Sequence, residues 1–213
     1  MAPDASPLIY QAHVWIRQIS PMIWRQRWVR SDSTLADLHD TIQIAFGWTD
    51  VHLHRFRLRG KDYGIPLAYG PWYSTDAREV TLEEFSFRHN ERFLDEYDFG
   101  ALWQHEVRME QRLPVVTGRL YPMCIGGRHS GPPEDCGDPW AFMVRRDAVF
   151  WEAEELLDEL IEGADAGDRD AVEDSLARVC SMRPWLSLER FDRREINRRL
   201  THYALGEEGW SWT

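Results

Sequence analysis

The sequence predicts an α+β fold with a mixed or antiparallel sheet, followed by a helical C-terminal part. In the first sixty residues, apolar and polar side chains alternate with the period of a strand, interrupted by one stretch with the period of a helix. Beyond residue 147 the helical period dominates. We therefore expect an α+β domain over residues 8–145 and a helical extension over 146–213 that packs on it.

The predicted domain begins with a strand, a strand, a helix and a strand, an order compatible with a β-grasp-like half. Residues 22–30 are rich in β-forming side chains and follow a turn signal at Ser20-Pro21, so they are expected to return as a hairpin partner. The strand that precedes them, residues 9–17, alternates so that one side carries Tyr10, Ala12, Val14 and Ile16.

A helix is predicted next, because Leu35 and Leu38 begin a run of apolar residues at helical spacing. Thr34 and Asp37 have the spacing of a capping box, in which each residue hydrogen-bonds the other's backbone. Gly47 suits the end of this helix, since a residue without Cβ adopts a left-handed conformation at little cost.

Further elements follow from the same two periods. Residues 113–141 contain five prolines and several glycines and are expected to form an ordered loop. Strands are predicted at 51–58, 92–99 and 102–110 with a hairpin or bulge at Gly100, a short helix at 81–85, and longer helices from 147, at 170–182 and at 193–200.

Composition indicates a folded protein with a sizeable core. Of the 213 residues, 43% are hydrophobic and 11 are tryptophans, which gives ample apolar surface to offset chain entropy. The net charge is −11, which argues against broad attraction to a phosphate backbone. Residues 152–174 alone carry eleven acidic side chains and one basic one, so the acidity is local and the rest of the chain carries −1.

The sequence predicts a cytoplasmic protein without a membrane partner. No apolar run approaches the roughly 18 residues that a membrane-spanning helix needs. The opening MAPDASPLIY lacks the basic region and apolar core of an export signal. Three cysteines at irregular spacing do not make a disulfide framework, so reduced thiols are expected.

Six separated segments carry a family resemblance: PMIWRQRWV, TLADLHDTIQIAFGWTDVHLHRF, YDFGALWQHEV, PMCIGG, GPPEDCG and FDRREINRRL. In this set and order the chain resembles the plasmid pRiA4b open-reading-frame-three-like family, most closely over residues 8–142. Its members occur on plasmids and as passenger proteins of some insertion sequences. The resemblance implies an α+β fold and an accessory protein of mobile elements, and it implies no defined activity.

Two positions depart from the family pattern. Ala101 stands where the family usually has an acidic residue after YDFG, and Gly131 stands where it tends to have a cysteine before PPEDCG. The resemblance implies that a family metal site built on those two positions would have lost two ligands here.

A zinc site is one hypothesis, since neutral imidazoles and thiolates are natural zinc ligands. The spacing is not diagnostic, because eleven residues separate the two candidate cysteines and no C-x-x-C occurs. The alternative is a polar strand face with two small buried thiols, so no cofactor is predicted and zinc stays a hypothesis. The candidate ligands are His52, His54, His105, Cys124 and Cys136, with Asp50 joining the two neighbouring histidines if their strand extends that far back.

An acid/base hydrolase is a second hypothesis, with His105 as general base. Asp98, Glu106, Glu134 or Asp135 would orient the imidazole or share the proton transfer. No G-x-S-x-G motif supplies a nucleophile. GPPEDCG also has a structural explanation, because its prolines fix φ and its carboxylates accept bonds from free backbone amides; we favour a rigid turn over a site.

Nucleic-acid binding is a third hypothesis, because WRQRWVR interleaves Trp24 and Trp28 with Arg25 and Arg27. These residues can stack on bases and neutralise phosphates, with both arginines on one strand face. The alternative is a hairpin edge whose arginines prevent pairing with other strands while the tryptophans pack, and the pattern favours this.

An aromatic surface around Tyr97 and Trp103 is a candidate small-ligand site. If the register holds across Gly100, these rings share a face with His105, which we expect to be a packed, hydrogen-bonded member of that aromatic wall. Taken together, the sequence favours an accessory protein that binds a protein or nucleic-acid partner, with a hydrolase and a small-ligand module as alternatives. Whether it is an enzyme is left open, with binding favoured.

Overall fold

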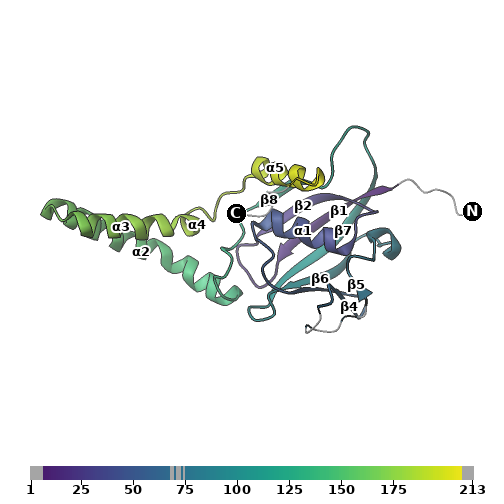
Figure 1. The fold of residues 1–213 in the computed structure, drawn as a ribbon, viewed down its shortest axis with the longest axis horizontal. Coiled ribbons are helices and arrows are strands. Elements are labelled where there is room, and N and C mark those ends of the chain that lie inside the picture. Colours follow the sequence, from purple (N-terminus) through teal and green to yellow (C-terminus); the bar gives the residue numbers. More distant parts are fainter. Residues whose placement is uncertain (1–6, 68–69, 71–72, 74, 208–213) are drawn as a thin grey trace, which may run out of the picture.

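The computed structural model describes residues 7–67, 70, 73 and 75–207 (Figure 1). The first six residues, which belong to the predicted opening segment, and residues 208–213 of the predicted extension lie outside the described residues.

The core of the molecule is one eight-stranded sheet in the order β5-β4-β3-β6-β7-β1-β2-β8. All neighbouring strands run antiparallel except β4 and β5, which are parallel, so the sheet is mixed. The strands are β1 Leu8–Ile16, β2 Trp24–Arg30, β3 His54–Leu58, β4 Lys61–Gly64, β5 Thr75–Asp76, β6 Glu91–Tyr97, β7 Trp103–Pro114 and β8 Met123–Arg128.

One helix lies between the second and third strands, and most of the helical residues come after the sheet (Figure 1). The predicted α+β class, the strand–strand–helix–strand start and the helical C-terminal part are therefore confirmed. The helices are α1 Leu35–Phe46, the short 3₁₀ helix η1 Leu82–Phe85, α2 Pro139–Ala166, α3 Arg169–Ser181, α4 Arg183–Leu186 and α5 Arg193–Ala204.

Helix α1 packs on one face of the sheet and buries its apolar side chains there. Leu35, Leu38 and Ile42 are at most 1% exposed, and each contributes about 2 kcal/mol of hydrophobic stabilisation. The facing side of β1 carries Tyr10, Ala12, Val14 and Ile16, as the alternation predicted. The opposite face of β1 and β2 bears half-buried polar and aromatic side chains.

The ends of α1 form as the sequence predicted. The Thr34 hydroxyl accepts from the Asp37 amide at 3.0 Å, and the Asp37 carboxylate accepts from the Thr34 amide at 2.8 Å. Gly47 has a φ of 87°, in the left-handed region, and its amide donates to the Gln43 carbonyl. This sharp end directs the chain back towards the sheet.

Strand β3 is shorter than predicted, because it begins at His54 instead of residue 51. The amides of Val51 and His52 donate to the Tyr97 hydroxyl, at 3.1 and 3.3 Å. The Tyr97 hydroxyl thus accepts the hydrogen bonds that a neighbouring strand would otherwise accept from these two amides.

The predicted loop over 113–141 contains strand β8, which pairs with β2 at the edge of the sheet. Its sequence, MCIGGR, lacks a clear alternation because of the paired glycines. A Cβ on Gly127 would lie 2.4 Å from the Phe191 ring and 2.9 Å from the Trp24 carbonyl oxygen, so close packing accounts for a glycine there.

Helix α2 begins at Pro139, earlier than predicted. The Asp138 side chain caps it by accepting from the Ala141 amide at 2.7 Å, and proline at the first helical position has no amide to satisfy. The predicted boundary at residue 145 falls inside this helix, whose Phe142 belongs to the main core.

Helix α5 docks on α1 through Tyr203, whose hydroxyl lies 2.9 Å from Asp37 Oδ1 and 3.1 Å from Asp40 Oδ2. The Tyr203 hydroxyl has one proton to donate to these two carboxylates. Burial raises the pKa of Asp40 to about 6. Because this pKa lies above its unfolded value, folding favours the protonated form.

We expect the stability that Asp40 contributes to be complete below about pH 4 and to be lost as the pH rises through 6. Between pH 4 and pH 8, the unfolding free energy of the wild type should therefore fall by on the order of 1–3 kcal/mol relative to that of Asp40→Asn. Urea unfolding at the two pH values measures this difference. Asp32→Asn is the control with the opposite trend, because Arg30 lowers the pKa of Asp32. A difference between wild type and Asp40→Asn that does not change with pH would contradict this account.

Candidate functional site

A cluster of polar side chains lies buried between α1 and the sheet. Asp95, in the middle of β6, is completely buried, as are His39 of α1 and His105 of β7. His39 Nδ1 lies 3.0 and 3.1 Å from the two carboxylate oxygens of Asp95. His105 Nδ1 lies 3.3 Å from Asp95 Oδ2, without the angles of a good hydrogen bond.

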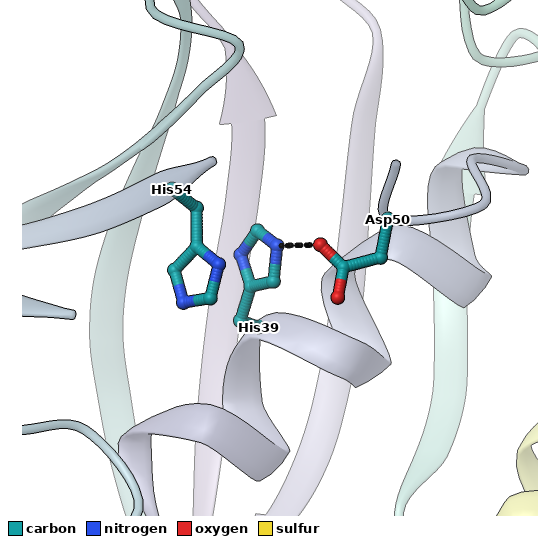
Figure 2. Close-up of side chains that lie close together, drawn as sticks. All are labelled: His39, Asp50 and His54. Carbon is teal, nitrogen blue, oxygen red and sulfur yellow. Dashed lines mark hydrogen bonds and ion pairs between the residues drawn. The ribbon is translucent and has the colours of Figure 1, made fainter. Parts of the chain in front are cut away.

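The second ring nitrogen of His39 faces the loop that follows α1. Nε2 lies 3.0 Å from Asp50 Oδ1 (Figure 2). The Asp50 side chain is 29% exposed. The ring of His54, at the start of β3, stacks on that of His39 with centroids 3.4 Å apart and planes 12° from parallel. Asp50 and His54 line a cavity of about 150 Å³.

The charges in this cluster are set by burial and by the two carboxylates. Burial alone would lower the pKa of His39, but Asp95 and Asp50 outweigh it and raise that pKa to about 10. Burial opposes the charge of Asp95, yet the contact with His39 holds its pKa well below the usual range. Burial and the neighbouring His39 charge lower the pKa of His54 to about 3. A charged His39 therefore lies between two carboxylates, with a neutral imidazole against its face.

The GPPEDCG segment holds the loop that carries Asp50. Glu134 Oε2 accepts from the Thr49 amide at 2.8 Å and from the Thr49 hydroxyl at 2.5 Å, while the Tyr97 hydroxyl donates to Glu134 Oε1 at 2.6 Å. The Trp48 indole donates to the Pro132 carbonyl at 2.8 Å. These contacts agree with the predicted rigid turn.

Gly131 precedes this turn and lies directly against the end of α1. A Cβ at this position would be 1.9 Å from the Phe46 carbonyl oxygen. A cysteine, which is the residue that the family pattern favours here, therefore does not fit this backbone arrangement.

The five candidate zinc ligands do not gather at one place. His52 bonds Asp135 at 2.7 Å, and His105 lies against Asp95. Cys124 is buried in a second small core between β8 and α5, and Cys136 packs against the main core. All three cysteines are unpaired.

Within the described part of the chain, one group of three potential metal ligands does gather: His39, Asp50 and His54, with ligand atoms within 4.8 Å of one another. Sequence reasoning found His54 and Asp50 and missed His39. The signal was present, because His39 follows Leu35 by four residues and precedes Ile42 by three, which places it on the apolar stripe of α1.

The hydrolase arrangement around His105 is not assembled. The ring packs against Phe46 and Trp48, each 5.1 Å away between centroids, and is closed to solvent. The Asp98 carboxylate stabilises the turn that follows it, because it accepts hydrogen bonds from the Gly100 and Ala101 amides at 3.0 and 3.3 Å. Glu134 and Asp135 bond the loop after α1 instead, so none of these carboxylates forms a described contact with His105.

The exposed basic stripe that nucleic-acid binding would need is contradicted by burial. The favoured interpretation, a hairpin edge whose arginines prevent pairing, is also wrong, because β2 pairs with β1 on one side and β8 on the other. Arg25 and Arg27 share one strand face as expected, but that face is the inner one, and they are 2% and 0% exposed. Arg25 Nε donates to the Ala45 carbonyl at 2.8 Å, where the unpaired carbonyls of α1 need donors. Trp24 and Trp28 lie on the outer face, half-buried, so neither arginine can meet a phosphate beside them.

Tyr97 and Trp103 do not form a ligand-binding surface either. They pair across β6 and β7 and are 1% and 3% exposed, because both pack against Trp48 with ring centroids 5.3 and 5.4 Å apart. The predicted aromatic wall exists, and it belongs to the core. The expectation that His105 is hydrogen-bonded within it is wrong, because neither ring nitrogen has a hydrogen-bond partner among the described residues.

Helices α2 and α3 form an arm that extends away from the sheet (Figure 1). They pack closely at Gly163, where an added Cβ would lie 3.3 Å from the Ala171 Cβ. Val149, Leu156 and Met182 make a small core along the arm. No helix among the described residues is both long and apolar enough to cross a membrane, α2 included.

Helix α2 of the arm carries several exposed apolar side chains. Phe150, Leu157 and Ile161 fall on one side of α2, at spacings of seven and four residues. The large exposed apolar side chains of α2 are Trp140 at 69%, Val144 at 49%, Phe150 at 66%, Trp151 at 71%, Leu157 at 51% and Ile161 at 57%.

Together, these observations define an α+β sheet protein with a buried His–Asp cluster and a projecting acidic helical arm. Comparison with family models matches residues 8–173 to the plasmid pRiA4b ORF-3-like protein, and the chain belongs to that family.

The chain is also similar to two proteins of unknown function. The chain is 31% identical to an uncharacterized protein, y4hQ, of Sinorhizobium fredii over 164 residues, which covers 76% of this chain and 84% of the relative. The crystal structure of a protein of unknown function, MM3350 from Methanosarcina mazei Go1, is similar with a TM-score of 0.63 at 29% identity. That similarity covers 89% of this chain and 96% of the other.

The pairing of Asp95 with His39 leads to a stability prediction. Asp95→Asn should cost about 3–5 kcal/mol of unfolding free energy, because it removes the fully buried carboxylate beside the charged His39 and leaves that charge to the partly exposed Asp50. Chemical denaturation measures this loss. Asp62→Asn, at a half-exposed carboxylate on β4, is the matched control and should cost less than about 1 kcal/mol. Equal losses in the two variants would be incompatible with a buried ion pair.

The two buried arginines of β2 should differ in importance. Arg25 donates to three backbone carbonyls, whereas Arg27 donates to Thr41 Oγ1, and its Nε and Nη2 have no partner among the described residues. We expect Arg25→Met to cost about 2–3 kcal/mol more than Arg27→Met, by thermal and urea unfolding. Arg27→Met as the costlier change would contradict the described bonding.

Proposed function

We propose that the protein is a mobile-element-associated accessory protein that binds a basic protein partner through the α2–α3 arm. The observation that carries this proposal is the apolar stripe of Phe150, Leu157 and Ile161, which is 51–66% exposed on a helix that projects from the body. Several large apolar side chains exposed on one side of a helix are typical of protein–protein contact sites.

The charge of the arm defines the chemistry of the partner. Residues 152–174 carry a net charge of −10 around and beside the stripe, while the rest of the chain is close to neutral. An amphipathic helix of this kind fits a hydrophobic groove with a basic rim, because apolar anchors supply affinity and opposite charges steer the encounter. Nucleic acid is disfavoured by the same charge, and two arms of two copies would repel each other.

The test compares two variants in which exposed apolar side chains are replaced by glutamine, one on the arm and one elsewhere. Phe150→Gln, Leu157→Gln and Ile161→Gln are combined in one variant. The control carries Val116→Gln and Leu120→Gln, at positions that are 48% and 50% exposed on the loop before β8. Circular dichroism checks that both variants keep their helices.

Proteins retained from a host extract are identified, the retained partner is purified, and its affinity for each variant is measured. The proposal predicts a basic partner whose affinity falls at least about tenfold with the arm variant, stays unchanged with the control and weakens with salt. Equal affinity of the arm variant, retention that a nuclease abolishes, or a wild-type dimer that the arm variant dissociates would each overturn it.

A further inference from the structure

The start of β3 holds a polar side chain that the core does not need. His54 is 6% exposed, and its Nε2 has no hydrogen-bond partner among the described residues. A leucine or phenylalanine would pack here without the loss of solvation that an unpaired imidazole nitrogen suffers. A buried nitrogen without a partner is the form that a metal-binding histidine takes before its ion binds.

The neighbours of His54 supply the other donors. His39 Nε2 and Asp50 Oδ1 are 3.0 Å apart, and the ring of His54 stacks on that of His39 (Figure 2). One donor atom from each of the three residues lies within 4.8 Å of the others. Two imidazoles and one carboxylate are the ligands that zinc and its neighbours in the first transition row bind in proteins.

Asp95 prepares His39 for this role. Its carboxylate accepts from Nδ1, which directs Nε2 towards Asp50 and raises the basicity of the ring. Metal-binding histidines commonly have such a carboxylate behind them. Asp95 is completely enclosed by protein and would stay in place when an ion binds.

Access to the cluster comes through the side of Asp50. The cavity of about 150 Å³ that Asp50 and His54 line provides an entry path and room for a water molecule on the ion. The ring of His54 has to turn from its stacked position to reach the ion. This turn breaks no hydrogen bond of Nε2, because Nε2 has no partner among the described residues.

We propose that His39, Asp50 and His54 bind a divalent transition-metal ion, with two imidazole nitrogens and one carboxylate oxygen as protein ligands and open positions facing the cavity. The ion takes the place of the proton on His39 Nε2, and that proton leaves to solvent. Three protein ligands with an open position form the pattern of reactive metal sites, whereas structural zinc sites are closed by four.

The experiment uses the full chain, free of any tag and stripped of metal with a chelator. Zn²⁺ is titrated into it and followed by calorimetry, and the metal content after dialysis is measured by mass spectrometry. Co²⁺ serves as a second probe, because its visible absorption reports nitrogen and oxygen ligation directly.

Two ligand variants and one control make the result specific. His54→Phe keeps a ring in the stack and removes both nitrogens, and Asp50→Asn removes the carboxylate charge. His89→Gln alters an exposed histidine outside the cluster. Thermal unfolding of the metal-free variants checks that each is folded; His54→Phe is expected to melt at or above the wild-type temperature because no unpaired nitrogen is buried.

The proposal predicts about one ion per wild-type chain, at least about tenfold weaker binding by both ligand variants, and unchanged binding by His89→Gln. Added Zn²⁺ should raise the melting temperature of the wild type more than that of His54→Phe. Failure of the wild type to retain Zn²⁺ or Co²⁺ would overturn the proposal. So would equal affinities of wild type and folded His54→Phe, which would place the ion elsewhere.

Discussion

Asp95 carries a negative charge in the middle of the sheet, where an isolated carboxylate would be severely destabilising, and the contact with His39 of α1 compensates it. Because the partner lies on the covering helix, this pair fixes α1 both along and across the sheet, as apolar contacts alone would not. His105 Nδ1 lies 3.3 Å from the same carboxylate, whose charge also favours the charged form of the buried Arg27. The inner face of the sheet is therefore organised around one charge.

The position of α1 determines the course of the chain beyond the helix. Gly47 ends α1, and the next residues are held by Glu134, which bonds Thr49 and Tyr97. The resulting loop brings Asp50 to the free side of His39. The proposed metal site is thus a consequence of how the helix is anchored. The α2–α3 arm extends away from the sheet and contributes no residue to this site.

Local patterns in the sequence predicted the elements well, because strands, capping boxes and glycine helix ends depend on neighbours in the chain. The alternation in β2 correctly placed Arg25 and Arg27 on one face. Which face is buried depends on the carbonyls of α1 and on Asp95, partners distant in sequence. His39 was missed for the same reason: its position on the apolar stripe was visible, but its carboxylate partner lies 56 residues away.

The central claim is that a charged His39 between two carboxylates anchors the helix on the sheet. Nitrogen NMR of the imidazoles in metal-free protein at neutral pH tests it most directly, with His39 assigned by its substitution. The account predicts that both ring nitrogens of His39 carry a proton while His54 is neutral. A neutral His39, with a proton on one nitrogen, would contradict it.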